Sequence, residues 1–254
     1  VKKGGIMASS SVGGLSGGEA VEHISLRLLF ILDHFSDRVA PGRPISLQSG
    51  YRSPSYNAKL KDGGGNVAST STHMDGTAID FYIDGVDGKG LWEMIRHEAC
   101  CGVGHYGGRT IHLDAGRPRF WQAATSKTGT GESDFNRKIY LSTDYDRYVA
   151  GERMTFSLSS VSTFGFGVDR RVRLVREGQG AVTVEGVLGE EGNGPDCLII
   201  RDRKEARSLS VFLPRPMSPG MYRLAVDFCR IPFSQMPKGV SSHILEVVRN
   251  EKDR

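Results

Sequence analysis

One stretch of the chain decides the fold of its first half: Ser71-Thr72-His73-Met74-Asp75-Gly76-Thr77-Ala78-Ile79-Asp80-Phe81-Tyr82-Ile83. Residues 78–83 are rich in β-branched and aromatic side chains, which predicts a strand. Successive side chains of a strand point to opposite faces, so Ile79, Phe81 and Ile83 are expected on the core side. Asp80 then lies on the other face beside Ala78, whose small side chain leaves room for a neighbour.

A second motif, Thr110-Ile111-His112-Leu113-Asp114, has the same alternation. Ile111 and Leu113 are expected to face the core, which leaves His112 and Asp114 together on the opposite face. Two strands of one sheet could therefore direct Asp80, His112 and Asp114 into one cleft.

The two motifs together offer two imidazoles and a carboxylate. His73 would come from the turn before the first strand, where Gly76 permits a tight approach to the sheet. Zinc binds His nitrogen and carboxylate oxygen readily, and a catalytic zinc site keeps its fourth position for water. A spacing such as His-x6-Asp is common by chance, so the prediction depends on the ordered string and the later His-x-Asp together. This combination favours a hydrolytic metal site.

Three further segments accompany the motifs: Ser49-Gly50-Tyr51-Arg52-Ser53-Pro54-Ser55-Tyr56-Asn57, Gly102-Val103-Gly104-His105-Tyr106 and Gly116-Arg117-Pro118-Arg119-Phe120-Trp121. In this order, the segments resemble those of the D-alanyl-D-alanine carboxypeptidase and hedgehog-type metallopeptidase superfamily. More closely, they resemble its YcbK-like bacterial zinc peptidases, which act on peptidoglycan. The similarity extends over about residues 20–122. It implies an α+β zinc peptidase domain in which helices accompany an antiparallel sheet.

The resemblance implies roles for individual residues. His73, Asp80 and His112 match the three ligands of Zn²⁺, and Ser71 and Arg52 match positions that line the substrate site. A guanidinium such as that of Arg52 can hold a carboxylate or a peptide carbonyl through paired donors. Ser71 could equally be an ordinary loop or capping residue.

The general base is not fixed by the resemblance. Many superfamily members place Glu, Asp or His a few residues before the last zinc ligand, whereas this chain has Arg109 three residues before His112. Asp114 is the first candidate, because strand alternation puts it next to His112, from where a carboxylate could take a proton from metal-bound water. His105 is the second candidate. Asp75, which is expected to be exposed, is the third.

The leading hypothesis is a zinc-dependent peptidase that hydrolyses peptide bonds of peptidoglycan stem peptides or cross-links, as a D,D-carboxypeptidase or a murein endopeptidase. The bond that is cut stays open, because specificity lies in loops. An alternative is a catalytically idle, zinc-containing module that binds cell-wall peptides, since the acidic residue before His112 is missing. A third hypothesis gives the carboxy-terminal half the main role, in wall binding.

The composition is that of a folded, mildly basic protein. The 254 residues carry a formal net charge of +4, which would favour acidic wall polymers, and no clustered basic patch indicates nucleic acid. No secretory signal opens the chain, and its most apolar run, Leu26–Phe35, is too short and too interrupted to span a membrane. Export to the periplasm or cell envelope is inferred from the expected substrate. The oligomeric state stays open.

The length suits two domains. Residues 1–124 are expected to form the peptidase domain, residues 125–135 a linker, and residues 136–254 an all-β, immunoglobulin-like sandwich that serves as an accessory domain. Helices are expected at Glu19–Phe35 and Leu91–Ala99. Short strands between Gly and Pro turns are expected at Ile139–Ser142, Met154–Ser159, Val172–Arg176, Val182–Val187, Cys197–Asp202, Ser208–Leu213, Tyr222–Phe228 and His243–Val248.

The four cysteines leave the redox compartment open. Cys100 and Cys101 are adjacent, and neighbouring cysteines seldom form a disulfide. Cys197 and Cys229 lie on or beside expected strands and could pair, although buried free thiols are an equal alternative.

Overall fold

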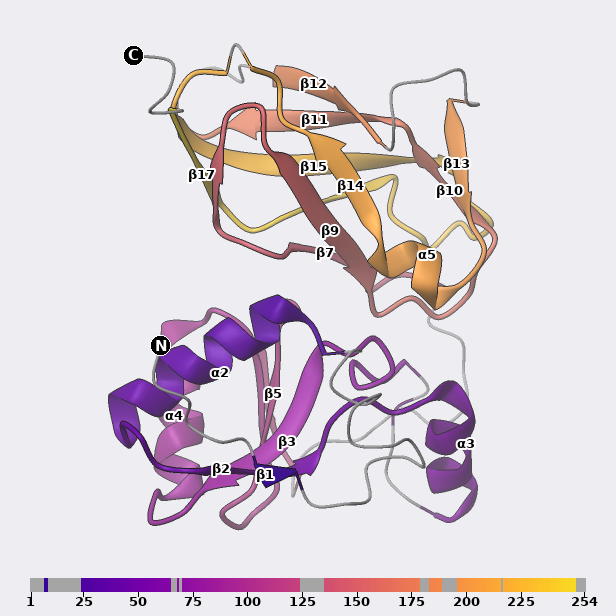
Figure 1. Ribbon diagram of the computed structural model, residues 1–254. Helices are drawn as coiled ribbons and strands as arrows, with labels where there is room; N and C mark the ends of the chain where they lie inside the picture. Colours follow the sequence, from indigo (N-terminus) through magenta and orange to yellow (C-terminus); the bar gives the residue numbers. More distant parts are fainter. Residues whose placement is uncertain are drawn as a thin grey trace. The chain divides into compact units, whose positions relative to one another are not determined.

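The computed structural model describes residues 7–8, 24–64, 68, 70–123, 135–178, 183–188, 196–215 and 217–249. The chain divides into two compact units, Val1–Glu132 and Ser133–Arg254 (Figure 1). The division falls inside the expected linker 125–135, of which residues 125–134 lie outside the described residues. Separate hydrophobic clusters form the cores of the two units.

The sheet of the first unit has the strand order β1-β2-β3-β5-β4-β6. Its central pairs are antiparallel, as expected, whereas β1–β2 and β4–β6 are parallel. The pair β4–β6 is parallel because β5 lies between these strands in the chain. The chain reverses its direction once before β5 and once after it. The strands are β1 (Met7–Ala8), β2 (Ile45–Ser49), β3 (Ala78–Ile83), β4 (Gly102–His105), β5 (Ile111–Asp114) and β6 (Arg119–Gln122).

Two helices cover the apolar face of this sheet (Figure 1). Leu32 of α2 and Ile95 of α4 are buried in one core with Ile79 of β3 and Leu113 of β5. The core-facing residues of both strands are therefore those that the alternation predicts. The helices of this unit are α2 (Leu26–Val39), α3 (Pro54–Asp62) and α4 (Gly88–Glu98).

Local signals set the helix boundaries. α4 begins after Asp87, whose side chain accepts backbone hydrogen bonds from the first turn, and it ends at Ala99, which has a φ of +50°. α2 begins at Leu26, whereas the sequence pattern predicts a start at Glu19; residues 19–23 lie outside the described residues. Within the described part of the chain, no helix has the length and apolar character needed to cross a membrane.

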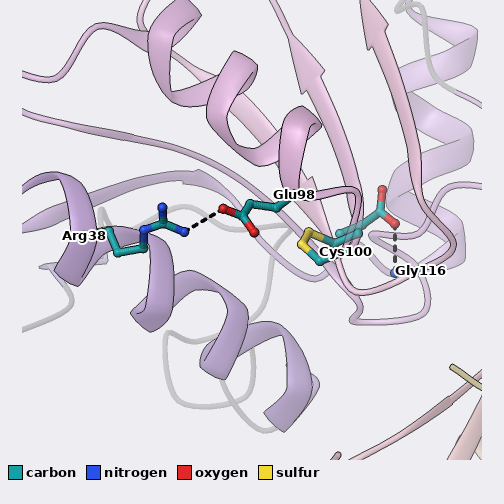
Figure 2. The surroundings of a disulfide bond; sticks show 6 residues. Arg38, Glu98, Cys100 and Gly116 are labelled. Carbon is teal, nitrogen blue, oxygen red and sulfur yellow. Dashed lines mark hydrogen bonds and ion pairs between the residues drawn. A yellow bond between two sulfur atoms is a disulfide. The ribbon is translucent and has the colours of Figure 1, made fainter. Parts of the chain in front are cut away.

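The turn between α4 and β4 carries a disulfide bond between Cys100 and Cys101 (Figure 2). The expectation that these adjacent cysteines do not pair is therefore wrong, because the turn holds their sulfur atoms side by side. Cys101 is buried in the core, and Cys100 is exposed. Figure 2 also shows the ion pair between Arg38 of α2 and Glu98 of α4, with 2.8 Å between Nη1 and Oε1. An exposed pair adds little stability, so the apolar core holds these helices.

The described residues of the second unit form a larger and a smaller sheet. The larger has the order β12-β11-β15-β10-β13, with β16 and β17 also paired with β15 and with β8 paired with β17; the smaller has the order β14-β9-β7. Both contribute to one core, as Phe156 of β9 and Leu224 of β15 illustrate. The strands are β7 (Tyr140–Thr143), β8 (Arg147–Val149), β9 (Arg153–Ser159), β10 (Phe166–Asp169), β11 (Arg171–Arg176), β12 (Thr183–Val187), β13 (Cys197–Ile200), β14 (Leu209–Phe212), β15 (Gly220–Arg230), β16 (Gly239–Ser241) and β17 (Leu245–Val248).

The second unit is β-rich, as expected for residues 136–254. Each expected strand overlaps an observed strand, and the sequence does not predict β8, β10 and β16. The unit is not purely β, because a short helix, α5 (Arg203–Arg207), follows β13. The immunoglobulin-like sandwich stays a prediction.

A disulfide bond in the larger sheet joins Cys197 of β13 to Cys229 of β15. β10 lies between these two strands in the sheet, and its Gly167 lies next to both sulfur atoms. A Cβ at Gly167 would lie 2.9 Å from the Cys229 Sγ and even closer to that of Cys197, so a side chain there would have to displace the disulfide. The sequence leaves open whether Cys197 and Cys229 pair or are free thiols, and in the structure they pair.

Removal of this disulfide by the double variant Cys197→Ser, Cys229→Ser is expected to lower the free energy of unfolding of the second unit by about 2–4 kcal/mol. The physical reason is the freedom that the unfolded chain gains when a cross-link between residues 32 positions apart is lost. Scanning calorimetry of the full chain measures the effect. The matched control is Cys100→Ser, Cys101→Ser, which opens a bond between adjacent residues in the other unit. Equal unfolding temperatures of wild type and the first variant would contradict the prediction.

Candidate metal centre

The register of β3 and β5 brings the two sequence motifs together. Asp80 pairs with His112, and Ala78 pairs with Asp114. Because alternate residues of these strands belong to the apolar core beneath the helices, these four residues lie on the other face of the sheet. Asp80 and His112 are nevertheless buried, with 6% and 5% of their surface exposed.

His73 reaches the same place from the turn before β3. The turn is closed by hydrogen bonds from Met74 N to Ser71 O and from Gly76 N to His73 O. Gly76 has a φ of +66°, a conformation that glycine adopts without strain. Ser71 is buried and begins the turn that carries His73. Its role in substrate binding stays a prediction.

Three donor atoms of His73, Asp80 and His112 converge. Asp80 Oδ1 lies 3.3 Å from His73 Nε2 and 3.0 Å from His112 Nδ1, and all three ligand atoms lie within 4.8 Å of one another. Among the described residues, His73 Nε2 is a buried atom without a hydrogen-bond partner. Such an atom is unfavourable in a folded protein unless something else satisfies it, and a metal ion would do so. Two imidazole nitrogens and one carboxylate oxygen suit Zn²⁺.

A second contact fixes each imidazole from its other nitrogen. His73 Nδ1 lies 2.8 Å from Gly50 O, and His112 Nε2 lies 2.9 Å from Asp114 Oδ2. Metal-binding histidines usually have such an outer partner, which sets the tautomer and the orientation of the ring. The donor atoms are thus oriented by contacts within the protein.

Arg52 supports the carboxylate of this cluster. Its Nη2 donates to Asp80 Oδ2 at 2.7 Å, and its Nε donates to Ser49 Oγ at 2.9 Å. The first bond leaves Asp80 Oδ1 facing the imidazoles. The side chain of Arg52 is 14% exposed. Its predicted role in substrate binding stays a prediction.

Asp114 lies behind His112. The carboxylate is completely buried and accepts hydrogen bonds from Arg119 Nη2 at 2.7 Å and from Gly116 N at 3.0 Å, in addition to its contact with His112 Nε2. Because His112 turns its Nδ1 toward Asp80, its ring separates Asp114 from the cluster. The role of Asp114 as the general base stays a prediction. Strand alternation correctly predicts the face of the sheet on which Asp114 lies. It does not predict that the ring of His112 lies between Asp114 and Asp80.

The other two candidate bases are His105 and Asp75. β4 pairs with β5 so that Gly104 lies opposite His112 and His105 lies opposite Ile111. His105 therefore belongs to the other face of the sheet and does not face the cluster, which corrects its expected role. Asp75 is 2% exposed, so the expectation of an exposed side chain is wrong.

Two aromatic residues to which the sequence assigns no role lie beside the cluster. Tyr106 Oη donates to Asp80 Oδ1 at 2.8 Å, and its ring packs edge-on against that of Trp121 with the centroids 5.1 Å apart. Trp121 also lies 5.7 Å from the ring of His112 and covers Gly104, where a Cβ would collide with the indole. The sequence signal for such a packed aromatic residue is the presence of Gly102 and Gly104 at alternate positions of β4. A glycine in a strand leaves room for a large neighbouring side chain.

The two carboxylates are held ionised. Burial by itself raises the pKa of Asp80, but the close contacts with the imidazoles of His112 and His73 outweigh burial and hold this pKa well below its ordinary value. Burial likewise raises the pKa of Asp114, and the contacts with His112 and Arg119 bring it below its ordinary value. Both groups are therefore negatively charged at neutral pH.

The two imidazoles are shifted in opposite directions. Burial lowers the pKa of His73 by more than Asp80 raises it, so His73 is neutral near pH 7. Burial also lowers the pKa of His112, but hydrogen bonds to Asp114 and Asp80 outweigh it and raise this pKa above its ordinary value. Burial and the charge of Asp80 raise the pKa of Tyr106, which keeps its hydroxyl protonated.

Comparisons with known proteins agree with the motifs. Residues 18–121 match the family model described as peptidoglycan L,D-endopeptidase MepK. The peptidoglycan L,D-endopeptidase MepK of Escherichia coli (strain K12) is 35% identical over 80 residues, which are 31% of this chain and 44% of that protein. The probable peptidoglycan L,D-endopeptidase MepK of Haemophilus influenzae is 40% identical over 82 residues, 31% of this chain and 42% of that protein. The chain thus spans less than half the length of these relatives, and the resemblance to this group of peptidases is confirmed for its first unit.

Proposed function

We propose that the first unit, which shares a family with the peptidoglycan L,D-endopeptidases over residues 18–121, is a metal-dependent peptidase that hydrolyses peptide bonds of peptidoglycan. The observation that carries the proposal is the convergence of His73, Asp80 and His112, whose ligand atoms lie within 4.8 Å of one another. The match to the named relatives supports the substrate class.

In the proposed mechanism, His73, Asp80 and His112 hold the metal ion, and zinc suits their donor set. When bound, such an ion lowers the pKa of water and polarises a carbonyl group. The protein's own residues prepare the site. Arg52 holds Asp80 Oδ2, so that Oδ1 stays directed at the imidazoles. Asp114 accepts a hydrogen bond from His112 Nε2–H, which leaves Nδ1 as the donor atom of the cluster.

We further propose that the enzyme is an endopeptidase for an L,D bond, because both named relatives are described as L,D-endopeptidases. Because peptidoglycan lies outside the cytoplasmic membrane, we propose that the protein acts in the cell envelope. The second unit is proposed as an accessory domain.

Digestion of purified sacculi by the full chain tests the proposed function. Zinc-loaded protein is expected to release new muropeptides, and mass spectrometry of the products identifies the bond that is cut. A strong chelator is expected to stop the release, and added zinc to restore it. A protein that binds muropeptides and zinc but never cleaves would instead favour the catalytically idle wall-binding module.

Zinc affinity is expected to decrease as the pH falls. Zinc binds neutral imidazoles, and the contacts of His112 with Asp114 and Asp80 raise its pKa in the metal-free protein, whereas the pKa of His73 is lowered. Below the raised pKa of His112, zinc must displace one proton, so Kd is expected to rise about tenfold per pH unit. Above that pKa, the Kd for zinc is expected not to change with pH. Competition with a fluorescent chelator between about pH 5.5 and 8.5 measures this dependence, and a Kd that is constant over the range would contradict it.

A further inference from the structure

The three candidate ligands are enclosed by protein, whereas Tyr106, which contacts one of them, is exposed. His73, Asp80 and His112 are between 2% and 6% exposed, and the side chain of Arg52, which also contacts Asp80, is 14% exposed. Tyr106 is 42% exposed, although its hydroxyl donates to the same carboxylate. Tyr106 therefore joins the enclosed cluster to the exposed surface of the first unit.

The hydroxyl of Tyr106 contacts the carboxylate oxygen that faces the imidazoles. Tyr106 Oη lies 2.8 Å from Asp80 Oδ1, which is also 3.0 Å from His112 Nδ1 and 3.3 Å from His73 Nε2. The other oxygen, Oδ2, is held by Arg52. A metal ion held by Asp80 Oδ1 would therefore lie next to the tyrosine hydroxyl. Because the proton of a hydroxyl rotates about the C–O bond, it can be directed to another acceptor at nearly the same position.

Packing of the ring places this hydroxyl independently of its bond to Asp80. Trp121 supports the ring of Tyr106 edge-on and itself lies over Gly104, where no side chain would fit. The two residues that follow, Gly107 and Gly108, have no atom within 4 Å of where a Cβ would be. The ring is thus supported by Trp121, and the next two residues have no side chain.

We propose that Tyr106 is a catalytic residue that donates a hydrogen bond to the carbonyl oxygen of the scissile peptide bond as negative charge develops on that oxygen. This rests on the proposed peptidase function. The hydroxyl transfers no proton; it moves its hydrogen bond from Asp80 Oδ1 to the substrate oxygen. A donor fixed in advance at a developing oxyanion accelerates a reaction by about 10²–10³-fold, because it needs no reorganisation when the charge appears.

The test compares Tyr106→Phe with the wild-type full chain. The phenyl ring keeps the contact with Trp121 and loses only the hydroxyl. The substrate is the muropeptide that the zinc-loaded wild type cleaves fastest. We expect kcat to fall by about 10²-fold, with KM and the Kd for zinc changed by less than about threefold. Binding of a phosphinate analogue of the cleaved peptide, whose oxygens imitate the oxyanion, is expected to weaken by the same factor as kcat. The control is Tyr82→Phe, whose ring packs beneath the guanidinium of Arg109, and it is expected to match the wild type.

Three outcomes would overturn the proposal. If kcat of Tyr106→Phe stays within about threefold of the wild type, the hydroxyl does not stabilise the oxyanion. If the affinity for zinc falls as much as kcat, the hydroxyl acts through Asp80 and not on the substrate. If zinc-loaded wild type cleaves no muropeptide from sacculi, the proposed peptidase function fails, and the proposal fails with it. The first two outcomes leave the peptidase function intact, so the two failures are distinguishable.

Discussion

His112→Ala is expected to remove metal binding and hydrolysis together. His112 lies opposite Asp80 in the β3–β5 ladder and supplies one of three donor atoms, so alanine leaves two ligands. The change also removes the imidazole that contacts the buried carboxylate of Asp114. We expect the affinity for zinc to fall by at least about 10³-fold and hydrolysis of muropeptides to become undetectable. Metal analysis after dialysis and digestion of sacculi measure the two effects.

The matched control for this variant is His105→Ala. His105 belongs to the neighbouring strand β4 and pairs with Ile111, so it lies on the other face of the sheet. This variant is expected to keep its zinc and its activity. Stoichiometric zinc in dialysed His112→Ala would show that the ion is held elsewhere, and equal losses in both variants would point to unfolding and not to ligation.

Asp114→Ala is expected to weaken zinc binding by about 10–100-fold, the range found when an outer partner of a metal-binding histidine is removed. The carboxylate holds His112 through Nε2 and is itself held by Arg119 and Gly116. Without it, the ring of His112 loses its fixed orientation and tautomer. Asp114→Asn keeps the size of the side chain and should show a smaller loss. Titration with zinc in the presence of a competing chelator measures both variants.

The control for Asp114 is Asp84→Asn, because Asp84 is an exposed carboxylate that pairs with Arg109 near the end of β3. It is expected to leave zinc affinity unchanged. The opposite result for Asp114 is informative: if Asp114→Ala binds zinc like the wild type but has lost turnover, Asp114 acts on the proton of the reaction, as strand alternation alone suggests.

Much of the site could be predicted from residue order. The alternation in residues 78–83 and 111–114 places Asp80 and His112 on one face, and the register of β3 and β5 then sets them directly opposite each other. The same reasoning fails for His105. Its strand, β4, has Val103 as its one apolar residue, so the sequence does not mark it as a strand; in the structure His105 shares the core face with Val103.

Most strands of the second unit could also be predicted from the sequence. Expected strands such as Met154–Ser159 and Val172–Arg176 agree with β9 and β11 nearly to the residue, because alternating apolar residues and turn residues mark their ends. β10 was missed, since Phe166–Asp169 contains a glycine where the disulfide of Cys197 and Cys229 lies. Strand pairing across a sheet depends on contacts between distant segments, which one sequence does not contain.

The sequence by itself determined which side chains share a face, because the period of a strand is a property of the backbone and needs no partner. That is how Asp80 and His112 could be placed on one face, while the choice of His73 as a ligand depended on the family resemblance. The tertiary structure decided which nitrogen of His112 faces Asp80, that Asp114 contacts the other nitrogen, and that the hydroxyl of Tyr106 contacts Asp80. These features depend on the rotation of side chains and on the pairing of β4 with β5 and of β6 with β4, and only the folded chain fixes those.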